Sequence, residues 1–368
     1  MKEKQLVVLL VVSLLVSILM PLSSVSAAAY GTDFVTSIAY MNIGTAAANI
    51  TLRVFESDGT YQDFTIASDF PVNAASTIYI GDLGGIGSDF KGSAIMSSSQ
   101  PLATTLIQIP QSPSTVKNRP LSTGFSSGEN VVLVPTVLKN YYETNSIFTV
   151  QNVDSVAADI TVEFVPLSGS VVTDNITLQP GAAKYYDMGG TTPITATSFN
   201  GSAVITAVQS GTSTPGAVVA TSLELHLTRD DTYAFEGVNE GGNTIYMPSS
   251  FCDWGAGNAM NAAFAVQNIS DTTEAQVTVT YSGGAVDGPY AIQPGAKRSF
   301  LGCTVNPYNW IGAATVTSTG GQVVAIGKIG GNDLSTAYVG FTQGYEKVAC
   351  PYVRWTEEYE LGEKQQVN

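Results

Sequence analysis

Hydrophobic and polar residues alternate along short segments of this chain, and the alternation recurs at a fixed distance. The pattern is clear in residues 50–54 (ITLRV), 160–164 (ITVEF) and 277–281 (VTVTY). A period of two is typical of a β-strand with one buried and one solvated face. The apolar stretch before each segment ends at an asparagine, namely Asn42, Asn152 or Asn268. Because asparagine tolerates left-handed backbone, we expect a tight hairpin connection after each of them.

Other landmarks repeat with the same step of about 110 residues. They are the prolines Pro71, Pro180 and Pro294, and the glycines Gly92, Gly201 and Gly312. A period of this length exceeds that of solenoid repeats and matches one sandwich domain of about seven short strands. Beyond the N-terminal apolar run, no segment has helical periodicity. We therefore predict an all-β protein with three tandem immunoglobulin-like antiparallel β-sandwich domains, arranged like beads on a string.

The N-terminus has the features of a secretory signal peptide. Lys2 and Lys4 precede the apolar run 6–20, and small residues ending at Ala27 or Ala29 provide cleavage sites. The alternative is an uncleaved membrane anchor. We predict that residues 1–29 are a signal peptide, that the protein is secreted or lies on the cell surface, and that no integral membrane domain remains after cleavage.

A proline-containing apolar segment also recurs, around Pro135, Pro248 and Pro351. If it is the last strand of each unit, the domains are 30–140, 141–254 and 255–355, followed by an acidic tail, 356–368. If it is the first strand, the first repeat lacks a strand that the C-terminal region carries spare, which favours strand donation between molecules. A third possibility is that 356–368 starts a truncated fourth repeat. We favour the first interpretation.

Residues 149–166 (TVQNVDSVAADITVEFVP) and 176–188 (ITLQPGAAKYYDM) carry a loose strand-turn-strand signature. This signature resembles the CARDB-like, adhesion-related immunoglobulin-like repeats of bacterial secreted and surface proteins. The first repeat departs from it, since Val72-Asn73 stands where Pro-Gly is expected. The resemblance extends over nearly the whole mature chain and implies an immunoglobulin-like fold at the cell surface.

Charge and motifs argue against nucleic-acid binding and catalysis. Charged residues make up 12% of the chain and the net charge is −15, so the clustered basic residues that bind phosphate are missing. The string Gly124–Gly128 fits G-x-S-x-G but lies in a polar stretch between repeats. His226, the only histidine, lies in an alternating strand. We predict no enzyme activity, no catalytic or metal site and no cofactor.

Three cysteines lie in or beside the third repeat, and export makes oxidation plausible. We favour a disulfide between Cys252 and Cys303, with pairing of Cys350 to either of them as the alternative. If Cys350 is unpaired, its alignment with Val134 and Met247 predicts a buried apolar position. A free exposed thiol that joins two molecules is the other possibility.

Two further sets of residues are candidates for binding or modification. The possible ligand-facing aromatic residues, which follow the recurring prolines, are Tyr141, Tyr142, Trp254 and Trp355. The possible glycosylation sites are Asn49, Asn175, Asn200 and Asn268.

These features together favour a non-catalytic extracellular or cell-surface protein with a structural or adhesive role. Repeated weak contacts along such a chain add through multivalency. The alternatives are an array of carbohydrate-binding modules, or a self-assembling filament subunit that donates its C-terminal strand. The expected partners are accordingly surface glycans or other copies of the same chain.

Overall fold

The computed structural model describes residues 28–111, 114, 116–255, 257, 260–331, 334–346 and 348–350, and the backbone of 355–356 and 365–366. Residues 1–27 of the expected signal peptide, and most of the expected tail, lie outside the described residues. Ala29 is fully buried, and its amide donates a hydrogen bond to the carbonyl of Arg229 (2.8 Å). Cleavage after Ala27 keeps this contact, whereas cleavage after Ala29 removes it.

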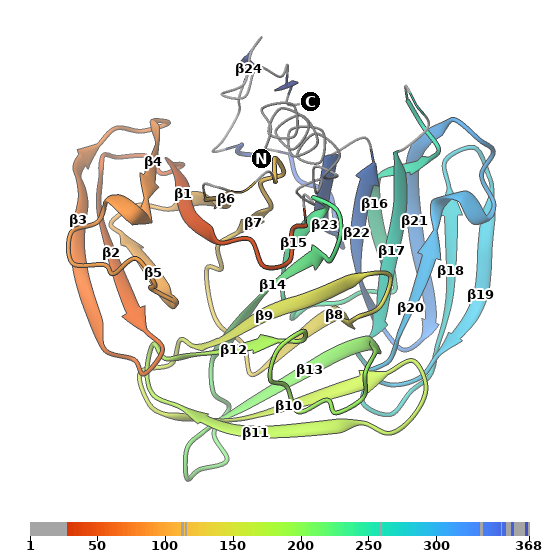
Figure 1. The fold of residues 1–368 in the computed structure, drawn as a ribbon, viewed down its shortest axis with the longest axis horizontal. Coiled ribbons are helices and arrows are strands. Elements are labelled where there is room, and N and C mark those ends of the chain that lie inside the picture. Colours follow the sequence, from red (N-terminus) through yellow and green to blue (C-terminus); the bar gives the residue numbers. More distant parts are fainter. Residues whose placement is uncertain are drawn as a thin grey trace, which may run out of the picture.

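The described chain is built almost wholly of antiparallel strands, as predicted (Figure 1). The first sandwich contains β1 (Phe34–Asn42), β2 (Ala48–Glu56), β3 (Tyr61–Phe70), β4 (Ala75–Tyr79), β5 (Gly92–Ser98), β6 (Leu102–Pro110) and β7 (Leu121–Thr123), with the short 3-10 helix η1 (Ile80–Asp82). Its two sheets have the strand orders β4-β1-β6-β7 and β3-β2-β5.

The second and third sandwiches have eight strands each. The second contains β8 (Val131–Lys139), β9 (Thr144–Asn152), β10 (Ala158–Pro166), β11 (Val172–Leu178), β12 (Ala183–Asp187), β13 (Phe199–Gln209), β14 (Val218–His226) and β15 (Thr232–Glu236). The third contains β16 (Thr244–Cys252), β17 (Asn261–Asn268), β18 (Ala275–Tyr281), β19 (Val286–Ile292), β20 (Lys297–Leu301), η2 (Gly302–Thr304), β21 (Trp310–Gly320), β22 (Val323–Gly331) and β23 (Leu334–Val339). Two residue pairs, β24 (Trp355–Thr356) and β25 (Gln365–Gln366), form a separate ladder.

Equivalent strands have equivalent neighbours in the three sandwiches. The second has the orders β12-β9-β14-β15 and β11-β10-β13-β8, and the third has β20-β17-β22-β23 and β16-β21-β18-β19. Most connections therefore cross between the two sheets. The units are thus antiparallel sandwiches, with a strand order that differs from that of an immunoglobulin constant domain.

The proline segments around Pro135 and Pro248 are the first strands of their units and not the last. β8 pairs with β13, and β16 pairs with β21, so each segment completes a sheet of the sandwich that follows it. The expected boundaries at residues 140 and 254 are therefore wrong, because β8 and β16 belong to the second and third sandwiches. The pairing places the junctions in the linkers 124–130 and 237–243.

The apolar residues that alternate with polar ones along the strands form the cores, as predicted. In β10, Ile160, Val162 and Phe164 are at most 1% exposed, and the side chains between them face outward. The second sandwich has the largest buried cluster, centred on Phe148, Phe164 and Tyr186. Among the described residues, the first sandwich has two small buried clusters, surrounded by partly exposed apolar side chains.

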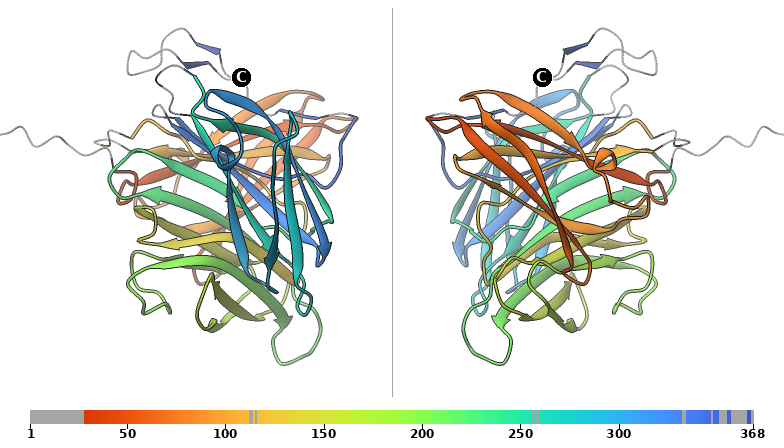
Figure 2. Two further views of the ribbon diagram at one scale, coloured as in Figure 1. Left: turned by 90° about the vertical axis from the view of Figure 1, so that its right-hand side faces the viewer. Right: turned by 90° about the vertical axis from the view of Figure 1, so that its left-hand side faces the viewer.

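The three sandwiches pack against one another and do not form separate beads. In Figure 1 the first lies on the left, the second below and the third on the right, and Figure 2 shows the same close packing from both sides. The edge strand β15 lies beside both β7 and β23. The buried Asn118 joins all three units, since it donates to the carbonyl of Asp230 (3.0 Å) and accepts from the amide of Ser335 (3.0 Å).

The two joints between units use equivalent residues. At the first joint, Ser93 Oγ donates to the carbonyl of Gly181 (2.9 Å). At the second, Ser202 Oγ donates to the carbonyl of Gly295 (2.7 Å). Each serine follows a glycine, Gly92 as the first residue of β5 and Gly201 as the third residue of β13, and each acceptor has a left-handed backbone (φ 79° and 69°). The third unit is therefore placed on the second much as the second is placed on the first.

Candidate functional site

The outer edge of β5 in the first sandwich has no strand partner among the described residues. The equivalent strands β13 and β21 are each covered on that edge, by β8 and β16. β5 pairs with β2 alone, so its other edge leaves backbone N–H and C=O groups available. Such an edge is a template for pairing with another strand.

The missing strand also leaves the first core open. Ala94, Met96 and Ser98 point inward from β5, yet Ala94 is exposed and the other two are only half-buried. Their equivalents in β13, Ala203, Ile205 and Ala207, are fully buried. Their equivalents in β21, Ala314, Val316 and Ser318, are at most 5% exposed. We call the gap beside β5 the slot, and define it by Ala94, Met96 and Ser98.

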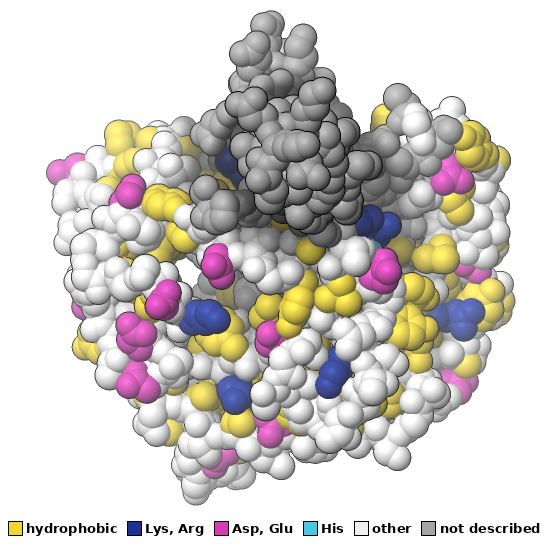
Figure 3. All heavy atoms as spheres, viewed as in Figure 1, with side chains coloured by type: hydrophobic (Ala, Val, Ile, Leu, Met, Phe, Trp, Pro, Cys, Tyr) yellow, Lys and Arg dark blue, Asp and Glu magenta, His cyan; other side chains and the backbone are white. Residues whose placement is uncertain are grey.

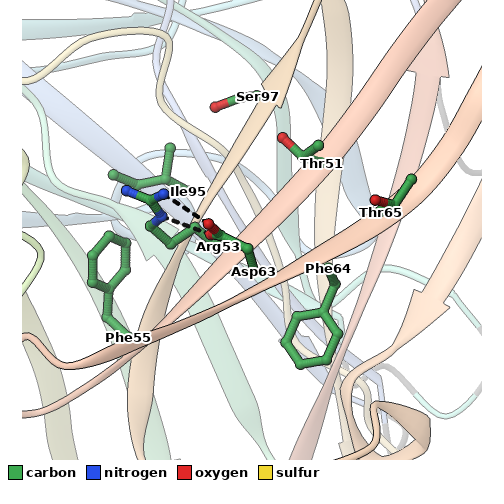
Figure 4. Close-up of a pocket in the computed structure, with 8 residues that line it drawn as sticks. All are labelled: Thr51, Arg53, Phe55, Asp63, Phe64, Thr65, Ile95 and Ser97. Carbon is green, nitrogen blue, oxygen red and sulfur yellow. Dashed lines mark hydrogen bonds and ion pairs between the residues drawn. The ribbon is translucent and has the colours of Figure 1, made fainter.

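A shallow depression of about 320 Å³ lies on the outer face of the same sheet (Figure 4). Figure 4 shows Arg53 of β2 and Asp63 of β3 turned toward each other, with two bonds of 2.7 and 2.8 Å. The hydrogen bond from Arg53 lowers the pKa of the Asp63 carboxyl. The remaining lining is made of Thr51, Phe55, Phe64, Thr65, Ile95 and Ser97. Since the two charges neutralise each other, the depression presents hydroxyl groups and an ion pair but no reactive acid or base.

A buried charged cluster lies at the joint of the second and third sandwiches. Lys328 Nζ lies 2.9 Å from Glu224 Oε2, and the Glu224 side chain is 1% exposed. Lys297 is 5% exposed. Burial, and then repulsion from Lys328, lower the pKa of Lys297 to about 7, against an opposing attraction from Glu224. Two lysines and one glutamate therefore share a site where the charged form of Lys297 is disfavoured.

This cluster predicts a rise in stability between pH 7 and pH 9. The folded-state pKa of Lys297 lies below its unfolded value, so the unfolded chain binds more protons in this range and unfolding becomes less favourable as pH rises. The slope has an upper limit of about 1.4 kcal/mol per pH unit. We expect Lys297→Met to flatten the dependence in urea titrations, whereas Lys184→Met, at an exposed position, keeps it. An unchanged slope in Lys297→Met would contradict the prediction.

The three repeated asparagines form identical buried clamps. Asn152 Nδ2 donates to the carbonyls of Val156 (2.9 Å) and Leu178 (3.0 Å), and its Oδ1 accepts from the amide of Asp154 (2.9 Å). Asn42 and Asn268 make the same three bonds, and all three residues are 0% exposed. Each clamp ties the turn after one strand to the end of another. The strands before and after each of these turns lie in different sheets and do not pair, so the hairpin expected after each asparagine is wrong.

This burial bears on the sequence-predicted glycosylation sites. Asn268 is a clamp residue with no exposed atom for a glycan, so its assignment as an acceptor is wrong for the folded protein. Asn49 and Asn175 are exposed, on β2 and β11. Asn200 is half-buried, and its Oδ1 is buried without a hydrogen-bond partner among the described residues.

The candidate aromatic residues do not gather at one place. Tyr141 and Tyr142 stack edge to face (4.6 Å) in the turn between β8 and β9, and Tyr142 is 71% exposed. Trp254 follows β16 in the third sandwich, packs against Phe251 (5.4 Å) and is 37% exposed. The side chain of Trp355 lies outside the described residues. The aromatic groups thus belong to separate units.

The cysteine pair favoured from sequence is joined in the structure. A disulfide connects Cys252 and Cys303, whose Cα atoms lie 4.8 Å apart. Asp253 lies beside them, but the bonded sulfurs are not available to a metal ion. Cys350 is a free, exposed cysteine, contrary to the buried apolar position expected for it.

His226 serves the turn between β14 and β15. Its Nδ1 accepts hydrogen bonds from the amides of Thr228 (3.1 Å) and Arg229 (3.0 Å). Burial, followed by the positive charge of Arg229, lowers the pKa of the ring. His226 is 4% exposed, and its Nδ1 already accepts two hydrogen bonds, as expected of a structural residue. The string Gly124–Gly128 lies in the linker between β7 and β8.

The molecular surface has few charges. On the face shown in Figure 3, basic and acidic side chains are scattered among polar and apolar ones. Within the described part of the chain, no helix is long and apolar enough to cross a membrane.

No protein-family model, curated protein or solved structure matches this chain. The resemblance to CARDB-like repeats accordingly stays an expectation from the residues that carry it.

Proposed function

We propose that this chain is a non-catalytic structural protein that works outside the cell, as a rigid scaffold with an adhesive or spacing role. The observation that carries the proposal is the repeated joint, in which Ser93 and Ser202 bond the equivalent carbonyls of Gly181 and Gly295. A joint that is reproduced from unit to unit fixes the angle between sandwiches. The three-way contact of Asn118 adds to this rigidity.

The proposal predicts a compact solution shape that depends on Gly181. A Cβ atom at this position would lie 2.1 Å from the ring of Phe55 across the joint. We expect Gly181→Ala to loosen the first joint, and small-angle scattering of the monomer to show a larger maximum dimension. Asn73→Ala is the matched control, because Asn73 has the same left-handed backbone (φ 60°) but is exposed.

An unaltered chain that scatters as flexible beads would contradict the scaffold role.

Export is tested separately, by N-terminal sequencing of the protein recovered from outside the producing cells. The buried contact of Ala29 leads us to expect Ala28 as the first residue. A protein retained inside the cell would contradict the extracellular role.

A further inference from the structure

In the second and third sandwiches, the first strand occupies the position that corresponds to the slot. In the second, β8 lies between β13 and Val238, which bridges to Leu133. In the third, β16 lies between β21 and Phe341, which bridges to Tyr246. Val238 and Phe341 each come two residues after the last strand of their unit. The equivalent residue of the first unit is Phe125, which is 37% exposed.

Residues 347–355 have the properties of the strand that the slot lacks. β8 and β16 are nine residues long with proline at the fifth place, and 347–355 (KVACPYVRW) has Pro351 at its fifth. Linkers of seven residues, 124–130 and 237–243, precede β8 and β16, and 340–346 is an equal linker after β23.

The apolar side chains of this segment are also placed to fill a core. The inward second and fourth positions are Val132 and Val134 in β8, and Ile245 and Met247 in β16, all at most 3% exposed. The equivalent residues are Val348, which is 74% exposed, and Cys350, which is exposed. One chain therefore contains both a sheet edge without a partner among the described residues and a segment whose sequence matches the strands that fill the equivalent edges.

We propose that residues 347–355 of one molecule fill the slot of a second copy, as an antiparallel strand on β5. The register follows from the complete sandwiches, where Val134 faces Ala203 and Met247 faces Ala314. By the same alignment, Cys350 faces Ala94. Main-chain bonds then give affinity, and the side chains at alternate positions give specificity. Repetition of this head-to-tail contact produces a filament or a ring.

The linkers between the sandwiches favour a second copy of the chain as the partner. A seven-residue linker leads from each sandwich to the first strand of the next sandwich along the chain. The linker 340–346 therefore directs 347–355 into a unit beyond the third sandwich. The first sandwich of another molecule fits that place, because its described residues form the equivalents of the other seven strands and leave this one position without a partner.

The N-terminal sequence carries a segment that matches the slot too. Residues 17–25 (SILMPLSSV) have Pro21 at the fifth place, with Ile18 and Met20 where β16 has Ile245 and Met247. Eight residues, 26–33, separate them from β1, just as 253–260 separate β16 from β17. Cleavage after Ala27 removes this segment. Under this proposal, removal of the segment leaves a second copy as the donor of a strand for the slot.

Light scattering after size exclusion tests the assembly on the mature chain, residues 28–368. We expect a mass that grows with concentration, and a monomer for Val348→Asp, which puts a charge at an inward position. Ala349→Asp, at the outward position beside it, should still assemble. A chain that starts at Ser17 should stay monomeric, because a tethered strand has a high effective concentration. A monomeric mature chain, or equal assembly of all four proteins, would overturn the proposal.

A cross-link tests the partner and the register. Ala94→Cys should form a disulfide with Cys350 of another molecule, seen as a ladder on non-reducing gels. The ladder should be absent in Ala94→Cys combined with Cys350→Ser, and weak in Ile95→Cys, whose side chain lies on the outer face of the sheet. A disulfide confined to monomers would assign the strand to its own chain and overturn the proposal. Strand donation rests on the scaffold role proposed above. A monomer that keeps the rigid shape would refute strand donation and leave the scaffold role intact.

Discussion

Replacement of both Cys252 and Cys303 by alanine is expected to lower the unfolding free energy of the third sandwich by about 4 kcal/mol. The disulfide closes a loop with a sequence separation of 51 residues, which limits the unfolded chain. It joins the end of β16 to η2, which follows β20, and so ties the two sheets together. Thermal and urea unfolding of the oxidised protein and the double variant measure the difference.

The control for this experiment is Cys350→Ala, which removes the exposed free cysteine and leaves the disulfide intact. We expect the unfolding midpoint of its third sandwich to match that of the unaltered protein within error, because Cys350 lies outside that sandwich. A double variant that is as stable as the control would show that packing alone holds β16 in place, contrary to the prediction.

Asn152→Ala is expected to destabilise the second sandwich by about 3–5 kcal/mol. The substitution leaves the carbonyls of Val156 and Leu178 and the amide of Asp154 without their partner in a buried site. Each buried polar group that loses its hydrogen bond costs about 1–3 kcal/mol. Water cannot easily replace the amide, because Asn152 is 0% exposed. Urea unfolding followed by tyrosine fluorescence measures the loss.

Asn175→Ala is the matched control in the same sandwich. This asparagine is exposed on β11 and accepts one hydrogen bond, from Thr161 Oγ1 (3.0 Å). We expect its effect to stay within about 0.5 kcal/mol, as for most surface substitutions. Equal effects at Asn152 and Asn175 would mean that the clamp contributes little to stability.

The strands were predictable because their pattern is local. Ile160, Val162 and Phe164 alternate with polar residues, and a period of two has one simple structural solution when one face is buried. The repeat of about 110 residues likewise predicted three similar units. The asparagines were noticed for the same reason, although their role as triple hydrogen-bond clamps depends on strand ends distant in sequence.

The unit boundaries could not be predicted in the same way. The segment around Pro135 follows one repeat and precedes the next, and its own residues fit either sandwich. Only its pairing with β13 assigns it to the second unit. Lys297 was missed because its sequence context is that of an ordinary surface strand. Its neighbours Lys328 and Glu224 come from other strands, and Glu224 from another unit.

The sequence by itself determined the all-β class, the number of repeats and the burial pattern within each strand, since these depend on neighbours a few residues apart. Tertiary structure alone decided how the sandwiches join, which strand completes which sheet, and that no described residue pairs with β5 at the slot beside Ala94 and Met96. Those features depend on contacts between residues that are far apart in the chain. Backbone hydrogen bonds between strands carry no residue code, so only the assembled sheets reveal an unpaired edge.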